Sequence, residues 1–252
     1  MDSIHSKAVI GKDVILAPNC IIEEKVKIES GTSIGEGVII KNGTEIGKNN
    51  EIHPYAIIGN TPQDKSYKGE GGKVVIGNNN IIREFTTIHL SVGKNTETLV
   101  GDNNYIMAYA HIAHNCIVGN NVLLVNGATL GGHVEVEDYT YISAFVPIHQ
   151  WVRIGAYSLI GGGFRITKDL IPYALAADSP IRVVSPNFVG LRRNGFSKEQ
   201  IENIKHAYRI LFRSNLNTKQ AIEKLMEEFD GNEDIERIIN FINKSKRGIV
   251  KG

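Results

Sequence analysis

Four of the eight histidines of this chain lie in one stretch, at His111, His114, His133 and His149. An imidazole can accept a proton near neutral pH, and it is also a common ligand of zinc. Three interpretations therefore compete: turns that carry histidines without a function, a metal site, and a site of acid–base catalysis. The choice depends on whether the fold brings these side chains together.

The elements that position the histidines follow from a repeat of six residues. Aliphatic residues recur at every sixth position from Ile10 to Ile58, from Ile76 to Ile88 and from Val100 to Ile166. The position two residues before each aliphatic is small or medium-sized, and Gly or Asn often follows. This period fits neither a helix nor simple strand alternation, so each hexad is expected to be a short strand with two inward side chains and a turn. Three hexads, or about 18 residues, form one triangular coil.

The uninterrupted part of the repeat allows the histidines to be assigned to a corner of the coil. Positions one coil apart lie above one another, and by this count all four histidines fall at one corner over three adjacent coils. Asn115 occupies the position of His133, one coil earlier. Such convergence argues against histidines that only decorate turns and favours a functional cluster.

Two segments leave the repeat, at residues 60–73 and 89–99. Loops of this length often carry function. After Ile166 the repeat fades into a linker that contains Pro180 and Pro186, and helical patterns follow. Ser197 to Gln200 form a capping box, a second helix starts near Thr218, and a third contains Ile235. We therefore expect a repeat domain over 1–186 and a helical domain over 187–252.

Composition limits the partners and the compartment. The formal net charge is only +1, which gives no reason to expect a nucleic-acid partner. No run approaches the roughly 18 apolar residues of a membrane span, and no apolar leader follows the first residues. Cys20 and Cys116 fall in the small inward phase, so we expect core thiols in a cytoplasmic protein. The tail from Arg192 onward is basic and could bind an acidic partner such as a carrier protein. The candidate contact residues are Arg192, Arg193, Lys205, Arg209 and Arg213.

Around His111-Ile112-Ala113-His114 the sequence closely resembles the UDP-N-acetylglucosamine O-acyltransferases that begin lipid A biosynthesis. The resemblance covers nearly the whole chain, including Pro62-Gln63-Asp64, Gly132-His133, His149-Gln150 and Gly190-Leu191-Arg192-Arg193. It implies a mainly β fold, a left-handed parallel β-helix of hexapeptide repeats with a C-terminal α-helical domain. It also implies a homotrimer with active sites at subunit interfaces.

The resemblance further implies transfer of a 3-hydroxyacyl chain from acyl carrier protein to the 3-position of UDP-GlcNAc, with no cofactor and no metal. His114 would be the general base, and the Gly132 N–H would stabilise the oxyanion. A glycine at the position of the acyl-chain ruler, Gly162, leaves room for a longer chain. The residues implied to contact substrate are Gln63, Asp64, His111, His133, His149, Gln150, Asn187 and Arg193.

Four positions depart from the common pattern of that family. Asn115 replaces an Asp, Ser66 a Lys, Val189 a Glu, and Asn194 the second residue of a basic pair. These four changes cluster around the sugar nucleotide, which is the acceptor. An alternative acceptor is therefore a UDP-sugar with a 3-amino group, and its acylation would give an amide. From other classes, a zinc-dependent β-helix carbonic anhydrase and a non-catalytic scaffold stay open at this point.

Overall fold

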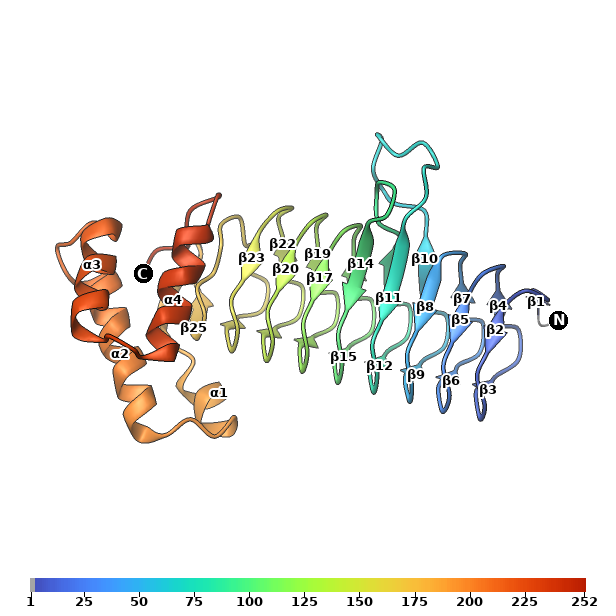
Figure 1. Cartoon of the computed structure of the whole chain (residues 1–252), viewed down its shortest axis with the longest axis horizontal. Helices are drawn as coiled ribbons and strands as arrows, with labels where there is room; N and C mark the ends of the chain where they lie inside the picture. Colours follow the sequence, from blue (N-terminus) through green and yellow to red (C-terminus); the bar gives the residue numbers. More distant parts are fainter. Residues whose placement is uncertain (1–2) are drawn as a thin grey trace.

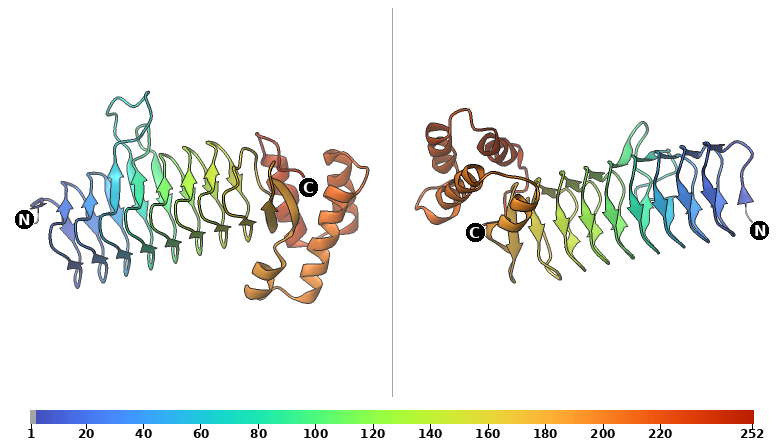
Figure 2. Two further views of the ribbon diagram at one scale, coloured as in Figure 1. Left: turned by 180° about the vertical axis from the view of Figure 1, so that it is seen from behind. Right: turned by 90° about the horizontal axis from the view of Figure 1, so that it is seen from below.

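The computed structural model describes residues 3–252. They form a left-handed parallel β-helix, a triangular prism of stacked coils, with a group of helices at its C-terminal end (Figure 1). Both parts of the expected fold class are thereby confirmed. Figure 2 shows the same prism from two other sides, with the helices confined to one end.

Each face of the prism is one sheet, and among β1 to β24 the paired strands lie three places apart in the chain order. The first sheet contains β1 (Ser3–Ile4), β4 (Ile21–Ile22), β7 (Ile39–Ile40), β10 (Ile57–Asn60), β13 (Thr87–His89), β16 (His111–Ile112), β19 (Thr129–Leu130) and β22 (Pro147–Ile148). The second contains β2 (Val9–Ile10), β5 (Lys27–Ile28), β8 (Thr44–Ile46), β11 (Lys73–Ile76), β14 (Glu97–Val100), β17 (Ile117–Val118), β20 (Glu135–Val136) and β23 (Arg153–Ile154). The third contains β3 (Ile15–Leu16), β6 (Ser33–Ile34), β9 (Glu51–Ile52), β12 (Ile81–Ile82), β15 (Tyr105–Ile106), β18 (Leu123–Leu124), β21 (Tyr141–Ile142), β24 (Leu159–Ile160), β25 (Ala174–Ala177) and β26 (Arg182–Pro186).

The aliphatic residues that recur at every sixth position form the core of the prism. From Ile22 to Ile166 each aliphatic of the series is at most 3% exposed. Burial of one such side chain contributes roughly 1.5–3 kcal/mol, so the repeat itself drives the fold. The small inward phase contains Cys20 and Cys116, both 0% exposed, as expected.

The two segments that leave the repeat project from the same edge of the prism (Figure 1). The strands reach slightly into the predicted segments, so the loops run over 61–72 and 90–96. The loops meet at their bases, where the Leu90 N–H donates to the Asn60 carbonyl at 3.0 Å and the Lys73 N–H donates to the Ser91 hydroxyl at 3.0 Å.

The segment expected as a linker is instead structured, and that expectation was wrong. The prism gains a further partial coil, because Ile166 bridges Ile148 and β25 pairs in parallel with β24. β26 then returns antiparallel to β25. The apolar residues of this hairpin, such as Ala174, Ala176 and Val183, are buried, which explains why the chain continues to pair after the period ends.

Four helices follow, of which the first was not expected: α1 (Phe188–Arg193), α2 (Lys198–Arg213), α3 (Thr218–Glu228) and α4 (Glu233–Lys244). The capping box at Ser197 and Gln200 is confirmed, and Asn217 and Gln220 form a second one before α3. The packed faces of α2 and α4 include Ile204, Tyr208, Ile235 and Ile238. Within residues 3–252, no helix has the length and apolar character needed to cross a membrane.

Candidate active site

One corner of the prism carries most of the predicted chemistry. Asn115, His133 and Trp151 follow β16, β19 and β22, and all three adopt positive φ angles of 58°, 60° and 66°. The turns are linked along the corner, since the His133 N–H donates to the His114 carbonyl at 3.0 Å and the Trp151 N–H to the Gly132 carbonyl at 3.0 Å. These backbone hydrogen bonds hold His114, His133 and Trp151 at the same corner of successive coils.

The orientation of His114 is set by Asn115. The Asn115 Oδ1 accepts from the Val92 N–H at 2.9 Å, and its Nδ2 donates to the Val92 carbonyl at 3.2 Å. These two contacts determine which end of the amide is oxygen. The same Oδ1 lies 2.9 Å from the His114 Nδ1, so Nδ1 carries the proton of the neutral ring. Nε2 therefore has a free lone pair, which is the form that a general base requires.

Asp64 approaches that nitrogen from the first loop. Its Oδ2 lies 3.7 Å from the His114 Nε2, and the two side chains are 31% and 12% exposed. Its Oδ1 accepts from the Ser66 N–H and hydroxyl, both at 2.8 Å. These bonds, with smaller effects of His114 and His133, lower the pKa of Asp64. An anionic carboxylate thus faces the atom that would become positive in proton transfer.

Gly132 lies beneath His114. The residue is buried, and its carbonyl accepts from the Trp151 N–H. Within the described part of the chain its own N–H donates to no other group. An N–H without a partner beside His114 is a suitable donor to a developing oxyanion.

His133 lies between two rings. Its ring meets that of His114 edge-on with centroids 5.2 Å apart, and it stacks on Trp151 at 3.6 Å with an interplanar angle of 6°. Burial and then the charge of His114 lower the pKa of His133, while Asp64 acts in the opposite sense. A neutral imidazole at this position can accept or donate one hydrogen bond to a polar ligand.

His111 lies on β16, three residues before His114, and its ring contacts the ring of His89. The two rings meet edge-on at 4.8 Å, and the Thr87 hydroxyl lies 2.7 Å from the His111 Nδ1. His89 is 3% exposed, and its Nδ1 has no hydrogen-bond partner among the described residues. Burial, followed by His111 and His114, lowers the pKa of His89 to about 4. Burial and then His114 also lower the pKa of His111.

The other predicted residues are spread more widely. Gln63 is exposed beside Asp64, and His149 lies at the same corner with its Nδ1 3.0 Å from the Gln150 carbonyl. Neither His149 nor the exposed Gln150 makes a hydrogen bond, ion pair or ring contact with His114 in the described chain.

Three predicted residues lie away from the corner. The buried Asn187 caps α1, where its Oδ1 accepts from the Gly190 N–H at 3.0 Å and its Nδ2 donates to the Tyr157 carbonyl at 2.9 Å. Arg193 is exposed at the end of α1, and Gly162 is exposed on the turn after β24, beside Ala144. No hydrogen bond, ion pair or ring contact within residues 3–252 joins any of them to His114.

The residues that depart from the family pattern have local contacts of their own. Ser66 holds the carboxylate of Asp64, and Asn194 forms the C-terminal cap of α1 with its Nδ2 on the Gly190 carbonyl at 2.9 Å. Val189 is 52% exposed on α1.

Two residues of the site were missed from the sequence. Trp151 lies one coil after His133 at the same corner position, so the count that grouped the histidines also identifies it. His89 follows an inward aliphatic directly, in a position that is mostly only partly buried in the other hexads, and no pattern marks it as fully buried. Among residues 3–252, no group of three or more His, Cys, Asp or Glu side chains is arranged to hold a metal ion.

Two family models match parts of this chain. A family model described as Udp N-acetylglucosamine O-acyltransferase, domain 2, matches residues 169–250. The bacterial transferase hexapeptide model (six repeats) matches residues 7–42 and 97–132.

Relatives match along the full length. The acyl-(acyl-carrier-protein)–UDP-N-acetylglucosamine O-acyltransferase of Thermodesulfovibrio yellowstonii is 48% identical over 249 residues, covering 98% of this chain and 96% of that protein. The UDP-N-acetylglucosamine acyltransferase structure from Bacteroides fragilis superimposes with a TM-score of 0.97 at 42% identity, over 99% of this chain and 98% of that one. The UDP-N-acetylglucosamine acyltransferase structure from Campylobacter jejuni superimposes with a TM-score of 0.94 at 38% sequence identity. The match covers 100% of this chain and 98% of that one. The protein is therefore an acyltransferase, and the chain belongs to the family of the UDP-N-acetylglucosamine O-acyltransferases.

Proposed function

We propose that this enzyme transfers a 3-hydroxyacyl chain from acyl carrier protein to the 3-hydroxyl of UDP-GlcNAc, the opening step of lipid A biosynthesis, with His114 as general base. In support, the name of the Thermodesulfovibrio relative contains an acyl-carrier-protein donor and UDP-N-acetylglucosamine, and that of the Bacteroides structure contains UDP-N-acetylglucosamine. The observation that supports the mechanism is the arrangement of His114 between Asn115 and Asp64, directly above the unpartnered N–H of Gly132. The carbonic anhydrase and scaffold alternatives are not retained, because the family is one of acyltransferases.

The proposed step moves one proton twice. Nε2 of His114 accepts the proton of the sugar hydroxyl while the oxygen attacks the thioester carbonyl, and the Gly132 N–H donates to the oxyanion. The C–S bond then breaks. The departing thiolate takes the proton back from Nε2, so the products are the sugar ester and the free thiol of the carrier. The carboxylate of Asp64 stabilises the transient imidazolium across a gap too wide for a direct hydrogen bond.

His114→Ala tests this mechanism. We expect kcat to fall at least about 100-fold, the range of general-base catalysis, with an unchanged melting temperature. His206→Ala on α2, an exposed histidine outside the corner, is the matched control and should keep full activity. Equal activity in the two variants would refute the role of His114.

The acceptor contacts are proposed to require a homotrimer. Gln63, Asp64, His111, His133, His149 and Gln150 are proposed to contact substrate from one chain, and Asn187, Arg193 and Gly162 from another. This division is proposed because the last three make no contact with His114 in their own chain. Mixing inactive His114→Ala chains with weakened Arg193→Ala chains during refolding should restore activity, because some sites then receive both intact residues. No recovery in mixed oligomers would contradict the shared site.

A second acceptor, a UDP-sugar with a 3-amino group, is favoured by Asn115. A neutral amide orients His114 but cannot neutralise an imidazolium, and a neutral amine needs less help from a base than a hydroxyl does. Competing the two UDP-sugars in one reaction decides between them, because an ester product is cleaved by mild alkali and an amide is not. Preferential ester formation would reject the amine. The cytoplasmic location stays a prediction.

A further inference from the structure

A serine on the first loop determines where the carboxylate of Asp64 lies. The Ser66 N–H and the Ser66 hydroxyl each donate to the Oδ1 of Asp64 at 2.8 Å. The Tyr67 N–H donates to the Asp64 carbonyl at 3.1 Å, so residues 64–67 form a tight turn. An aspartate that closes such a turn needs only the bond from the backbone N–H, and the bond from the hydroxyl is additional. Position 66 therefore does more than shape the loop.

The other oxygen of Asp64 faces the base. Oδ2 takes no part in the turn and lies 3.7 Å from the Nε2 of His114. Rotation of the carboxylate would break both bonds to Oδ1, and hydrogen bonds to a charged acceptor are among the stronger ones. The bonds from Ser66 also lower the pKa of Asp64, so the carboxylate is an anion at neutral pH. Ser66 thus fixes both the orientation and the charge of this group.

The base has one anionic neighbour. On the Nδ1 side, His114 meets the neutral amide of Asn115 at 2.9 Å. The other titratable side chains whose charge interacts with that of the ring are three histidines, His89, His111 and His133. Within residues 3–252, no carboxylate other than Asp64 forms an ion pair with His114. A positive charge on this ring therefore depends on Asp64 for a counter-charge.

The residue at position 66 fits the residue at position 115. The common pattern of the family has Lys at the first position and Asp at the second, whereas this chain has Ser66 and Asn115. An ammonium at position 66 would compete with an imidazolium for the carboxylate of Asp64, and a hydroxyl does not. The chain lacks an anion beside the base, and it also lacks the cation that could occupy the remaining anion. The net charge over positions 64, 66 and 115 is therefore the same as in the common pattern.

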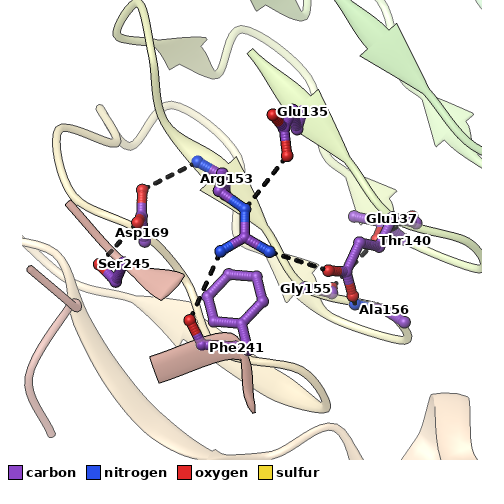
Figure 3. A network of polar contacts seen from close by, with 9 residues as sticks. All are labelled: Glu135, Glu137, Thr140, Arg153, Gly155, Ala156, Asp169, Phe241 and Ser245. Carbon is purple, nitrogen blue, oxygen red and sulfur yellow. Dashed lines mark hydrogen bonds and ion pairs between the residues drawn. The ribbon is translucent and has the colours of Figure 1, made fainter. Parts of the chain in front are cut away.

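A second serine–aspartate pair provides a structural comparison far from the corner. Asp169 is 1% exposed and accepts from the Ser245 hydroxyl at 2.7 Å and from the Arg153 N–H at 2.9 Å (Figure 3). Each of these bonds occupies one of its two carboxylate oxygens, and together they join the prism to the segment after α4. The side chain of Asp64, in contrast, is 31% exposed and has one oxygen left for the base.

We propose that Ser66 is a positioning residue of the acyl transfer. Its hydroxyl holds the Oδ1 of Asp64, so that Oδ2 faces the Nε2 of His114 and supplies the counter-charge that the neutral Asn115 cannot supply. In this role Ser66 acts through Asp64 and touches no reacting atom. The inference rests on the proposed function, which makes His114 the base and places a positive charge on its ring during the reaction.

Removal of the hydroxyl tests this role. Ser66→Ala keeps the backbone N–H and should lower kcat about tenfold, because the carboxylate loses one of the two bonds that orient it. KM for the acyl carrier protein should not change, and KM for the UDP-sugar should change less than kcat does. Ser66→Thr keeps a hydroxyl on Cβ and should restore kcat to near the wild-type value. Ser66→Lys should lower kcat at least as far as Ser66→Ala, because the ammonium pairs with the carboxylate.

A double-mutant cycle and a matched control complete the design. In an Asp64→Asn background, Ser66→Ala should lower kcat less than about twofold, because the charge that the hydroxyl positions is absent. Ser245→Ala is the matched control, since it also removes a serine hydroxyl from an aspartate. It should lower the melting temperature by about 2–4 °C through the lost buried hydrogen bond and leave kcat unchanged. Ser66→Ala should have the opposite effects on these two quantities, with an unchanged melting temperature and a lower kcat.

Each other result overturns the inference. Wild-type kcat in Ser66→Ala would show that the backbone bond alone positions Asp64, and fully additive losses in the cycle would show that Ser66 acts independently of the carboxylate. A change confined to KM for the UDP-sugar would make Ser66 a binding residue, and equal losses in Ser66→Ala and Ser66→Thr would remove the hydroxyl from the argument. Failure of the proposed function is distinguishable, because His114→Ala would then be as active as the wild type whatever the Ser66 variants do.

Discussion

A Cβ atom at Gly132 would lie 2.5 Å from both Nε2 and Cε1 of His114. The imidazole of one coil therefore lies against the backbone of the next, in space that any side chain would fill. The base and the proposed oxyanion donor are neighbours across two coils rather than along the chain. Both must keep their places for a reacting carbonyl to lie within reach of each.

Gly132→Ala should accordingly inactivate the enzyme through the position of its base. The added methyl displaces the His114 ring, and we expect kcat to fall about 100-fold or more. In a His114→Ala background the same change should add little, because no ring is left to displace. Fully additive losses in this double-mutant cycle would show that Gly132 acts independently of His114.

Asn115→Ala should reduce kcat about tenfold to a hundredfold with little change in KM. The variant frees the His114 ring to adopt the other tautomer and to rotate, but it leaves the substrate contacts in place. Asn115→Gln, which moves the amide by one methylene, should not restore activity. Steady-state kinetics with near wild-type kcat for Asn115→Ala would mean that the amide of Asn115 does not orient the base.

His89 should make stability depend on pH. Its pKa falls from an unfolded value of 6.5 to about 4, so only the unfolded chain binds this proton between those limits. The neutral buried ring stabilises the fold fully above about pH 6.5, and up to about 3 kcal/mol is lost as the pH falls toward 4.

His89→Leu should flatten the dependence of the melting temperature on pH between 7 and 4.5. His111 and His133, whose pKa values are also lowered, account for the slope that remains. His5→Leu, at an exposed position in the first coil, is the matched control and should keep the wild-type slope. The same slope in all three proteins would rule out His89 as the source.

Gly162→Met should shorten the acyl chain that the enzyme prefers. Gly162 is exposed, and a Cβ there would have only the Ala144 carbonyl at 3.3 Å as a close neighbour, so a longer side chain must extend outward toward the bound acyl group. Mass spectrometry of products formed from a mixed acyl-carrier-protein pool measures the change. An unaltered chain-length distribution would remove Gly162 from the role of ruler.

The six-residue phase made the prism and one corner of it predictable. Cys20 and Cys116 are buried where the phase places them, and His133 follows Asn115 one coil later along the corner. Hydrophobic periodicity is a property of every residue in the repeat, so its prediction survives local irregularity.

Features outside the phase were not predictable in the same way. The 3.7 Å approach of Asp64 to His114 depends on how a loop folds back, and only the family resemblance pointed to that carboxylate. His89 lies beside Asn60 of β10, where the strand register shifts at the base of both excursions, and the period does not describe such a local irregularity. The hairpin of β25 and β26 pairs after the period has ended, so periodicity could not reveal it.

The stacking of each strand on partners in the adjacent coils also limits how the chain can change length. Partners in the first coils lie eighteen residues apart, as Ile21 and Ile39 do. An insertion or loss of one whole coil before the excursions adds or removes one repeat of a linear array and leaves the corner intact. Insertion or loss of a single hexad would instead move every preceding hexad to a different face of the prism. Tandem duplication of complete coils is thus the route by which such a prism can grow without disturbing its catalytic edge.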